Sequence, residues 1–571
     1  MAALAPAYAP RRPTETALYG LVRENLETFL AYTREHYERG LPRYVENELR
    51  AFLKCGVFSE GFVRAHCDAC GHDLLIAFSC KSRTTCPSCA CRRMANTAAA
   101  VVDRVLPDVQ VRQYVLSLPF ELRRLAAFNA DVLTALGRIF VEAVFASYRA
   151  RAKRDGVREA QCGAINFVQR FGSSLNLNVH FHVVVLDGVF TREAKSGVAF
   201  HAASPPRRDE LEPIVVRLQT RARAWLRRHG HLDERPLEDR SNEAPSQTAL
   251  DACASIATAR GQMATLPNVD EPENDHAAVP GKTSVAVERD GFNLHAAVRI
   301  EAGDDVGREK LCRYAARPAL SLERLRRLPG GRVAYRLKYG NHGRGKHRIM
   351  PAMEFMARLA ALIPPPRYPL VRYAGVLGPR SAWRKDIVPK PRAAVAFGGT
   401  ARGPGRDPAR ASTPNSGTDG VTHTSRPMPK TDAESQPSPP RTLRTETYPT
   451  PASAIAHTGL SHGNAAVTLL APNILAVRHW DRLLAGVLYA VTPRLDWARL
   501  LRRSMDVDVL ACPQCDGRLR VLSILTERQP VERILSHLGM PLGPPPVSRA
   551  RDPSDEGGDE DRPGQLELAL A

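Results

Sequence analysis

The residues of this chain best suited to chemistry are cysteines that recur in closely spaced pairs. Cys67-Asp-Ala-Cys70 and Cys86-Pro-Ser-Cys89 are separated by fifteen residues, and the apolar run 74–78 lies between them as a predicted strand. Two such turns can place four thiolates tetrahedrally around Zn²⁺ at about 2.3 Å. Four unrelated buried cysteines would not produce this paired spacing. We therefore expect one structural zinc held by these four residues.

Three further cysteines lie beside this predicted zinc site. Cys55, Cys80 and Cys91 are surplus to a four-ligand site, and either Cys80 or Cys91 could replace one of the four ligands. Arg92 and Arg93 follow directly after the second pair. At that position their guanidinium groups would be available to bind phosphate.

A last cysteine pair, Cys512-Pro-Gln-Cys515, stands far from the others and makes only half of a zinc site. No second pair follows it. Either His457 or His462 would have to contribute, or the pair is a turn without metal. Cysteines clustered in this way indicate metal binding in a reducing compartment rather than a framework of disulfides.

Two histidines alternate with a phenylalanine in the apolar segment 178–186. Side chains alternate across a sheet, so His180 and His182 project from the same face of a strand and Phe181 enters the other. Two adjacent imidazoles can bind one divalent ion and leave positions open for phosphate oxygens. The alternative is a pair that is satisfied by hydrogen bonds or lies at the surface. On a long apolar strand, two histidines need either such partners or a metal.

Hydrophobic periodicity indicates an α+β fold around these residues. It predicts helices over residues 16–53, 95–105, 120–154, 217–228, 308–314 and 353–363. Strands are expected over residues 111–118, 164–171 and 176–186, with more strand pattern over 284–300 and a hairpin at 332–338. The prediction is thus N-terminal helices with a zinc ribbon, followed by an antiparallel-sheet core.

Changes in composition divide the chain into five regions. The linker and the acidic tail are expected to be disordered, because they are too poor in apolar residues to form a core. The regions are 1–106, helical arm and zinc ribbon; 107–385, the core, with an inserted loop at about 232–280; 386–465, linker; 466–550, a small C-terminal unit with the last cysteine pair; and 551–571, acidic tail.

The net charge of +20, from 80 Lys and Arg against 60 Asp and Glu, indicates a polyanionic partner. A genome rich in G and C, which favours Arg codons, would explain part of this excess. No stretch reaches the roughly 18 uninterrupted apolar residues of a spanning helix, and the N-terminus lacks the pattern of a signal peptide. We therefore expect a cytoplasmic protein that associates with the nucleoid when bound to DNA, and no membrane partner.

The motifs also occur in a recognisable order. They are Phe78-Ser-Cys-Lys-Ser-Arg83, Cys86-Pro-Ser-Cys89, Val115-Leu-Ser-Leu-Pro119, Asn176-Leu-Asn-Val-His-Phe-His182, Asp187-Gly-Val-Phe190, Leu311-Cys-Arg-Tyr-Ala-Ala-Arg-Pro318 and Arg372-Tyr-Ala-Gly375. A His-hydrophobic-His strand followed by a tyrosine beyond a helix resembles the HUH nuclease superfamily. The whole order is similar to that of rolling-circle insertion-sequence transposases of the IS91 type, which carry a zinc-binding domain ahead of the nuclease. The resemblance covers about residues 15–385 and 508–520.

This resemblance implies that a tyrosine hydroxyl attacks a DNA phosphodiester, forms a 5′-phosphotyrosine and frees a 3′-OH. A Mg²⁺ or Mn²⁺ held by the histidine pair would polarise the scissile phosphate. Tyr373 matches the family's Arg-Tyr-x-Gly motif and is the expected nucleophile. Tyr368, five residues earlier, is the candidate for a second one, since the family includes members with one and with two catalytic tyrosines. In the superfamily this tyrosine usually rides on a helix, whereas Pro366, Pro369 and Gly375 predict a turn or short strand here.

The superfamily takes its third metal ligand from elsewhere in the sheet. Gln169, on the strand expected to pair with the histidine strand, and His295 are the candidates, although either could be an ordinary strand residue. Arg313 and Arg317 flank Tyr314 and could clamp phosphate. An exposed helix face would explain these two arginines as well.

The expected function is that of a transposase acting on single-stranded or locally melted DNA. A plasmid replication initiator or relaxase would use the same tyrosine and metal, but the zinc ribbon in front favours a transposase. A zinc-ribbon DNA-binding protein without nuclease activity is the alternative from another class. It predicts that no covalent adduct with DNA forms.

Overall fold

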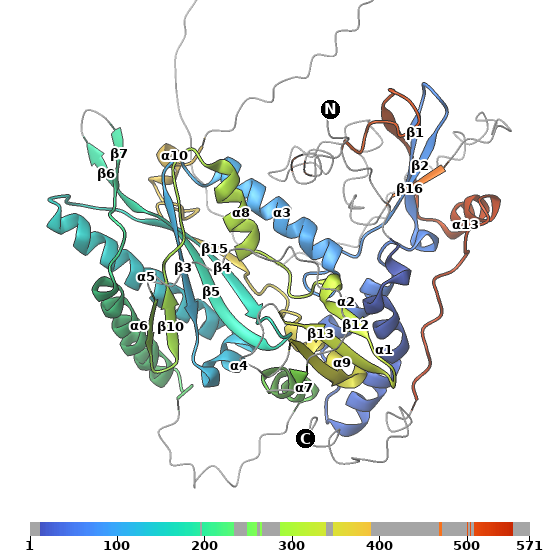
Figure 1. Cartoon of the computed structure of the whole chain (residues 1–571), viewed down its shortest axis with the longest axis horizontal. Helices are drawn as coiled ribbons and strands as arrows, with labels where there is room; N and C mark the ends of the chain where they lie inside the picture. The colour runs from blue at the N-terminus through green and yellow to red at the C-terminus, as the bar shows by residue number, and fades with distance from the viewer. Residues whose placement is uncertain are drawn as a thin grey trace, which may run out of the picture. The chain divides into compact units, whose positions relative to one another are not determined.

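The strand with the two histidines lies inside a seven-stranded antiparallel sheet in the computed structural model (Figure 1). The structure describes residues 12–193, 197–232, 248–259, 263–264, 286–337, 346–389, 467–470, 500, 503 and 508–551. The histidine strand is β5 (Leu177–Leu186), between β4 (Gly163–Phe171) and β3 (Val111–Ser117). The outer strands are β15 (Val371–Gly375) beyond β4 and, on the side of β3, β10 (Phe292–His295), β9 (Ala286–Arg289) and β11 (Arg299–Ile300). The three strands predicted at the centre are thus confirmed.

Alternation along the central strands gives the sheet two different faces. One face bears His182 and Phe167 and packs against α3 (Pro87–Arg104) and α8 (Asp305–Ala315), and we call it the histidine face. The opposite face bears Phe181 and packs against helices that include α4 (Phe120–Phe128) and α5 (Ala130–Arg154). In Figure 1, α3 and α8 run side by side, with α4 and α5 on the other side of the strands.

Two helices that periodicity predicts as single are each divided in two. The predicted helix 120–154 breaks at Asn129, whose side chain accepts hydrogen bonds from the amides of Asp131 and Val132 and thereby caps α5. The predicted helix 16–53 breaks before Pro42, which lacks the amide hydrogen that a continuous helix requires. The result is α1 (Ala17–His36) and α2 (Arg43–Leu53).

The region predicted as an inserted loop, 232–280, contributes to the core instead. Within it, α7 (Ala249–Thr258) buries Ala249, Ala252, Cys253 and Ala257. Because polar residues flank this short apolar helix, the average composition of the region does not reveal it. The next segment, β8 (Met263–Ala264), adds to a second sheet of β12 (Leu325–Arg327), β13 (Arg332–Arg336) and β14 (His347–Pro351).

The cysteine ribbon is a separate four-stranded sheet, built from both ends of the chain. Its strands are β1 (Phe62–Cys67), β2 (Asp73–Ala77), β16 (Val467–Leu470) and β17 (Leu519–Leu525). β17 pairs antiparallel with β1, so that Cys67 stands opposite Leu519. We expected residues 466–550 to be a unit of their own. In the structure, β16 and β17 from this region complete the N-terminal ribbon, and α13 (Arg528–His537) packs on the same sheet through Val531 and Leu535.

The other elements connect these parts. They are the hairpin β6 (Gly188–Glu193) and β7 (Gly197–Ala202), helices α6 (Arg208–Arg228), α9 (Ala352–Leu362) and α10 (Arg384–Ile387), and 3-10 turns at Pro13–Glu15, Phe58–Glu60 and Leu322–Arg324. The first residues of the expected linker therefore belong to α10. The rest of that linker up to residue 465, and the tail beyond residue 551, lie outside the described residues. Among the helices that are described, none has the length and apolar character needed to cross a membrane.

A buried ion pair ties β5 to its neighbours where the strand ends. Asp187 is fully buried and accepts hydrogen bonds from Nε and Nη2 of Arg112 at 3.1 and 2.9 Å. It also accepts one from the hydroxyl of Tyr148 on α5 at 2.6 Å. This explains Asp187 in the sequence motif as a residue that joins β3, β5 and α5.

Replacing Asp187 by Ala should lower the free energy of unfolding by about 3–5 kcal/mol, because the Arg112 guanidinium is left buried without its carboxylate. Urea denaturation followed by circular dichroism would measure this. Asp386→Ala is the matched control, since the 3.1 Å ion pair of Asp386 with Arg192 is exposed and should contribute at most about 1 kcal/mol. Equal effects of the two changes would show that the buried pair is not structural.

Candidate active site and zinc-binding cysteines

The two histidines of β5 stand side by side under helix α8. Their ring centroids are 4.9 Å apart, and both residues are buried, His180 at 8% and His182 at 3% exposure. Gln169 on β4 is opposite His180, and Phe167 is opposite His182. The pair is therefore not a surface pair, and its hydrogen bonds decide whether it is satisfied.

The hydrogen bonds leave a lone pair on Nε2 of His180 and leave Nε2 of His182 without a partner among the described residues. Nδ1 of His180 lies 2.9 Å from the carbonyl oxygen of Asn178, so Nδ1 must donate and Nε2 of the neutral ring carries the lone pair. In His182, Nδ1 lies 3.0 Å from the side-chain amide of Gln113, and Nε2 has no hydrogen-bond partner among the described residues. If the oxygen of that amide faces Nδ1, Nε2 of His182 is also a lone-pair donor. A buried polar atom without a partner, next to a second imidazole donor, fits a divalent cation.

The electrostatics keep both rings neutral, which is the form that binds metal. Burial lowers the pKa of His180 to about 4; the bond to the Asn178 carbonyl opposes this shift, and the positive charges of Arg317 and Arg123 add to it. Burial also lowers the pKa of His182 well below its usual range, with further contributions from His180 and Arg317. At neutral pH a cation would therefore displace no proton from either ring.

A tyrosine on α8 lies directly over this pair. The ring of Tyr314 is 5.6 Å from the ring of His182, centroid to centroid and nearly perpendicular to it, and the residue is 42% exposed. The guanidinium of Arg317 lies 5.1 Å from the centre of the Tyr314 ring. This tyrosine thus combines access to solvent, proximity to the imidazole of His182 and a neighbouring cation.

Gln169 fixes the end of α8 in this position. Its side-chain amide donates to the carbonyl oxygens of Tyr314 and Ala315, at 2.9 and 2.8 Å, and its oxygen accepts a 3.4 Å hydrogen bond from Arg317. The amide group is therefore occupied in holding the helix. Gln169 was a candidate third metal ligand, but here it positions Tyr314 over the histidines.

His295 also lies on the histidine face, but on β10. It is opposite Val115 of β3, which is in turn opposite His182, so one strand separates the two histidines. In the part of the chain that the structure describes, no cluster of three metal-ligating His, Cys, Asp or Glu side chains includes His180 or His182.

Of the two tyrosines expected as nucleophiles, Tyr368 lies on the opposite face and Tyr373 on the histidine face but at the edge of the sheet. Tyr368 is 2% exposed, and its hydroxyl donates to the carbonyl oxygen of Ala126, in the core of the opposite face. Tyr373 lies on the edge strand β15, two strands from β5, where burial raises the pKa of its hydroxyl and makes it harder to ionise. Neither is adjacent to the histidine pair.

The Arg-Tyr-x-Gly motif around Tyr373 has a packing role in this fold. Arg372 donates to the hydroxyl of Thr134 on α5 at 2.5 Å. Gly375 has φ +60°, and a Cβ at that position would collide with the carbonyl oxygen of Cys162. The motif therefore fixes β15 to the sheet. A signal for Tyr314 was available, because a helix is predicted over 308–314 and the superfamily tyrosine usually rides on a helix.

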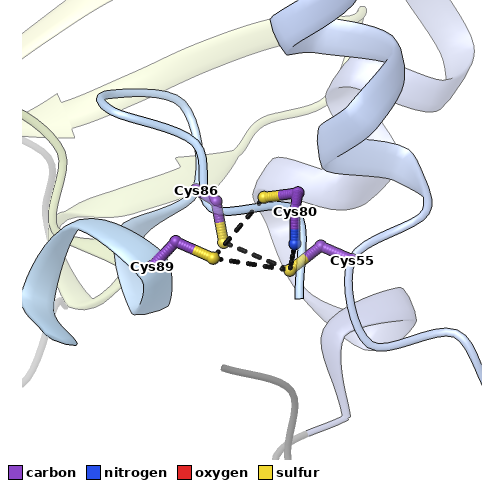
Figure 2. A group of neighbouring side chains, drawn as sticks. All are labelled: Cys55, Cys80, Cys86 and Cys89. Carbon is purple, nitrogen blue, oxygen red and sulfur yellow. Dashed lines mark hydrogen bonds between the residues drawn. The ribbon is translucent and has the colours of Figure 1, made fainter. Parts of the chain in front are cut away.

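The first group of cysteines lies where α2, β2 and α3 meet (Figure 2). It consists of Cys55, Cys80, Cys86 and Cys89, and their sulfurs all lie within 4.8 Å of one another. The shortest separations are 3.5 Å between Cys80 and Cys89 and 3.6 Å between Cys55 and Cys86. Four converging thiols at such distances are a complete set of zinc ligands.

A second group forms at the other end of the hairpin β1–β2. It brings together Cys67, Cys70, Cys512 and Cys515, again with all sulfurs within 4.8 Å. The two cysteine pairs that we expected to share one zinc therefore belong to different groups. The physical reason is the hairpin. Cys67 and Cys70 lie at its turn, whereas Cys80 follows the far end of β2, a strand of five residues that spans about 17 Å. Neither His457 nor His462, both outside the described residues, is needed to complete the second group.

Comparison with known proteins agrees with both parts of this arrangement. Residues 23–118 match the family model "Transposase zinc-binding domain" of the IS91 type, and residues 163–384 match the model "Putative transposase". Together the matches span more than half of the 571 residues. The chain is thus similar to IS91-type transposases in its zinc-binding segment and to transposases in its core.

Among relatives, the chain is similar to the transposase for insertion sequence element IS801 from Pseudomonas savastanoi pv. phaseolicola. The two are 28% identical over 209 residues, which is 36% of this chain and 46% of the relative. The chain thus matches less than half of that relative's length. No solved structure matches the chain significantly.

The histidine pair should bind one Mn²⁺ at neutral pH. His180→Ala and His182→Ala should each lower the affinity at least about tenfold, because each removes one ligand nitrogen. Titration followed by the electron paramagnetic resonance of free Mn²⁺ would measure this. His36→Ala, a change at the exposed end of α1, is the control and should leave the affinity unchanged. Unchanged binding in both β5 variants would contradict the site.

Proposed function

We propose that this chain is the transposase of a rolling-circle insertion sequence, and that it cleaves and rejoins single-stranded DNA through a 5′-phosphotyrosine on Tyr314. The observation that carries the proposal is the position of Tyr314 on α8, with its ring 5.6 Å from His182 and over the paired imidazoles of β5. The similarity to IS91-type transposases supports the same activity.

The chemistry assigns a task to each group. Nε2 of His180 and of His182 would hold Mg²⁺ or Mn²⁺, which when bound polarises the scissile phosphate. The Tyr314 oxygen attacks phosphorus and loses its proton. The bond from phosphorus to the 3′-oxygen breaks, and the leaving 3′-oxygen takes up a proton to become a 3′-OH. A phenol is a weak nucleophile until its proton is removed, so cleavage requires loss of that proton as the oxygen attacks. Attack of a 3′-OH on the phosphotyrosine rejoins a strand without ATP, because the bond energy is retained.

Arginines beside the site would bind the DNA backbone. A small cavity of about 90 Å³ is lined by Arg93 of α3 and by Arg317, with Gln169 between them. Arg92 is next to Arg93 on the same helix. Arg313 ion-pairs with Glu309 at 2.5 Å, so it contributes less to a phosphate clamp than its place in the sequence implies. The phosphate path we propose runs from α3 to the end of α8.

A plasmid replication initiator or relaxase would use the same chemistry. The zinc-binding match ahead of the transposase match, and a relative named as an insertion-sequence transposase, favour transposition. A zinc-ribbon DNA-binding protein without nuclease activity does not explain why two buried imidazoles and an accessible tyrosine share one site.

Tyr314→Phe should abolish the covalent adduct with DNA and leave the fold intact, because only one partly exposed hydroxyl is lost. The assay incubates the full chain and Mg²⁺ with labelled single strands of the DNA that flanks its gene, and separates adducts on a denaturing gel. Tyr368→Phe and Tyr373→Phe are the matched controls and should keep the adduct. Loss of the adduct in Tyr373→Phe with retention in Tyr314→Phe would move the nucleophile to β15.

DNA binding should depend strongly on salt, because arginines displace counterions from the phosphates. With about four phosphate contacts, affinity for a single strand should fall about 50-fold between 50 and 200 mM salt. Fluorescence anisotropy of a labelled oligonucleotide would measure it. Arg93→Ala and Arg317→Ala should each make the slope of log affinity against log salt less steep by about 0.7. An affinity that hardly changes with salt would contradict the electrostatic account.

A further inference from the structure

The segment just before β17 brings Cys512 and Cys515 to the ribbon, where they complete a second set of four thiols with Cys67 and Cys70. The sulfur of Cys67 lies 3.6 Å from that of Cys515, and the sulfur of Cys70 lies 3.5 Å from that of Cys512. We propose that these four cysteines bind a second Zn²⁺, separate from the Cys55 group, and that this ion clasps residues 508–525 onto the N-terminal ribbon.

The sulfur spacing fits a metal and not a disulfide. Four thiolates about 2.3 Å from one zinc in a tetrahedron are about 3.8 Å apart, close to the separations in this group. A disulfide requires about 2.05 Å, and all four cysteines are free. Like the Cys55 group it gathers four thiols, but here two CxxC pairs supply them, where the Cys55 group combines one CxxC pair with two single cysteines.

The backbone around the second pair is arranged to hold thiolates. The amide of Gln514 donates to the sulfur of Cys512 at 3.4 Å, and the amide of Gly517 donates to the sulfur of Cys515 at 3.3 Å. A Cβ at Gly517 would lie 2.7 Å from the sulfur of Cys67. Glycine at that position therefore lets the two cysteine pairs approach closely enough to share one ion.

β17 is held by its backbone pairing with β1, but few side-chain contacts hold the residues before it, 508–518, at the turn of the hairpin. Arg520 pairs with Asp68 at 2.5 Å, but both side chains are more than half exposed, so this ion pair contributes little. The apolar contacts are confined to a small cluster in which Val509 and Leu519 pack on strands of the ribbon. Because more than 400 residues separate the two cysteine pairs, closing the chain is entropically costly, and a metal is the group best able to offset that cost.

The test is the zinc content of the purified full chain, measured by plasma mass spectrometry. We expect two zinc ions per chain in the wild type and one in Cys512→Ser, Cys70→Ser or Cys86→Ser. Cys512→Ser combined with Cys86→Ser should have none. Cys91→Ser is the matched control, because Cys91 is exposed and outside both groups, and it should keep two.

Cys512→His keeps the test decisive if the serine variant does not fold. Histidine can replace a thiolate at zinc, so this variant should again hold two ions. After cobalt substitution, its sulfur-to-cobalt absorption should fall from eight thiolates per chain to seven. Limited proteolysis should cut residues 508–525 faster in Cys512→Ser than in Cys91→Ser. One zinc in the wild type, or two in Cys512→Ser, would overturn the proposal.

Discussion

The central constraint in this protein is that β5 is buried on both faces and still carries two imidazoles. From Val179 to Leu186 every residue of the strand is less than 9% exposed. A buried polar group without a partner is costly, so each ring nitrogen must be accounted for. His180 uses the carbonyl of its own strand, but Nε2 of His182 finds no partner among the described residues. The free-energy cost of burying Nε2 of His182 without a partner is the observation that favours a metal-binding pair over two ordinary core histidines.

The rest of the site follows from how the neighbouring strand holds a helix against this face. Gln169 is opposite His180, and it grips the last turn of α8 by two carbonyl oxygens. Since Tyr314 provides one of these carbonyls, the same contact that closes the helix end places its phenol beside His182. Arg317, one turn further on, is brought in by the same residue. Sheet register thus sets the position of Tyr314 relative to the histidine pair.

The ribbon depends on a different constraint, since a small sheet has little core of its own. Its apolar clusters are small and include residues from both ends of the chain, such as Val63 with Leu519 and Phe62 with Val531. Two groups of four thiols stand at opposite ends of the hairpin β1–β2. One supports the start of α3, whose other residues pack on the histidine face. Zinc binding and the active-site cover are therefore linked through a single helix.

The central strands could be predicted from the sequence because alternation is a local property, and so could the shared face of His180 and His182. The nucleophile could not be read in the same way. Tyr373 stood in a recognised motif, but Gly375 shows that this motif serves strand packing, whereas the position of Tyr314 depends on a contact between α8 and β4 that periodicity does not encode. The cysteine grouping was wrong for a similar reason, since spacing along the chain says nothing of a hairpin that separates Cys70 from Cys80 or of a strand that returns with Cys512.

The most direct test is to identify the tyrosine that becomes covalently linked to DNA. The full chain would be incubated with Mn²⁺ and a single strand from the end of its element, digested with nuclease and trypsin, and analysed by tandem mass spectrometry. We predict a nucleotide on the peptide that contains Tyr314, attached through the 5′-phosphate. A nucleotide on the peptide that contains Tyr368 or on the peptide that contains Tyr373, or on no tyrosine at all, would contradict the arrangement of β5 and α8 as the active site.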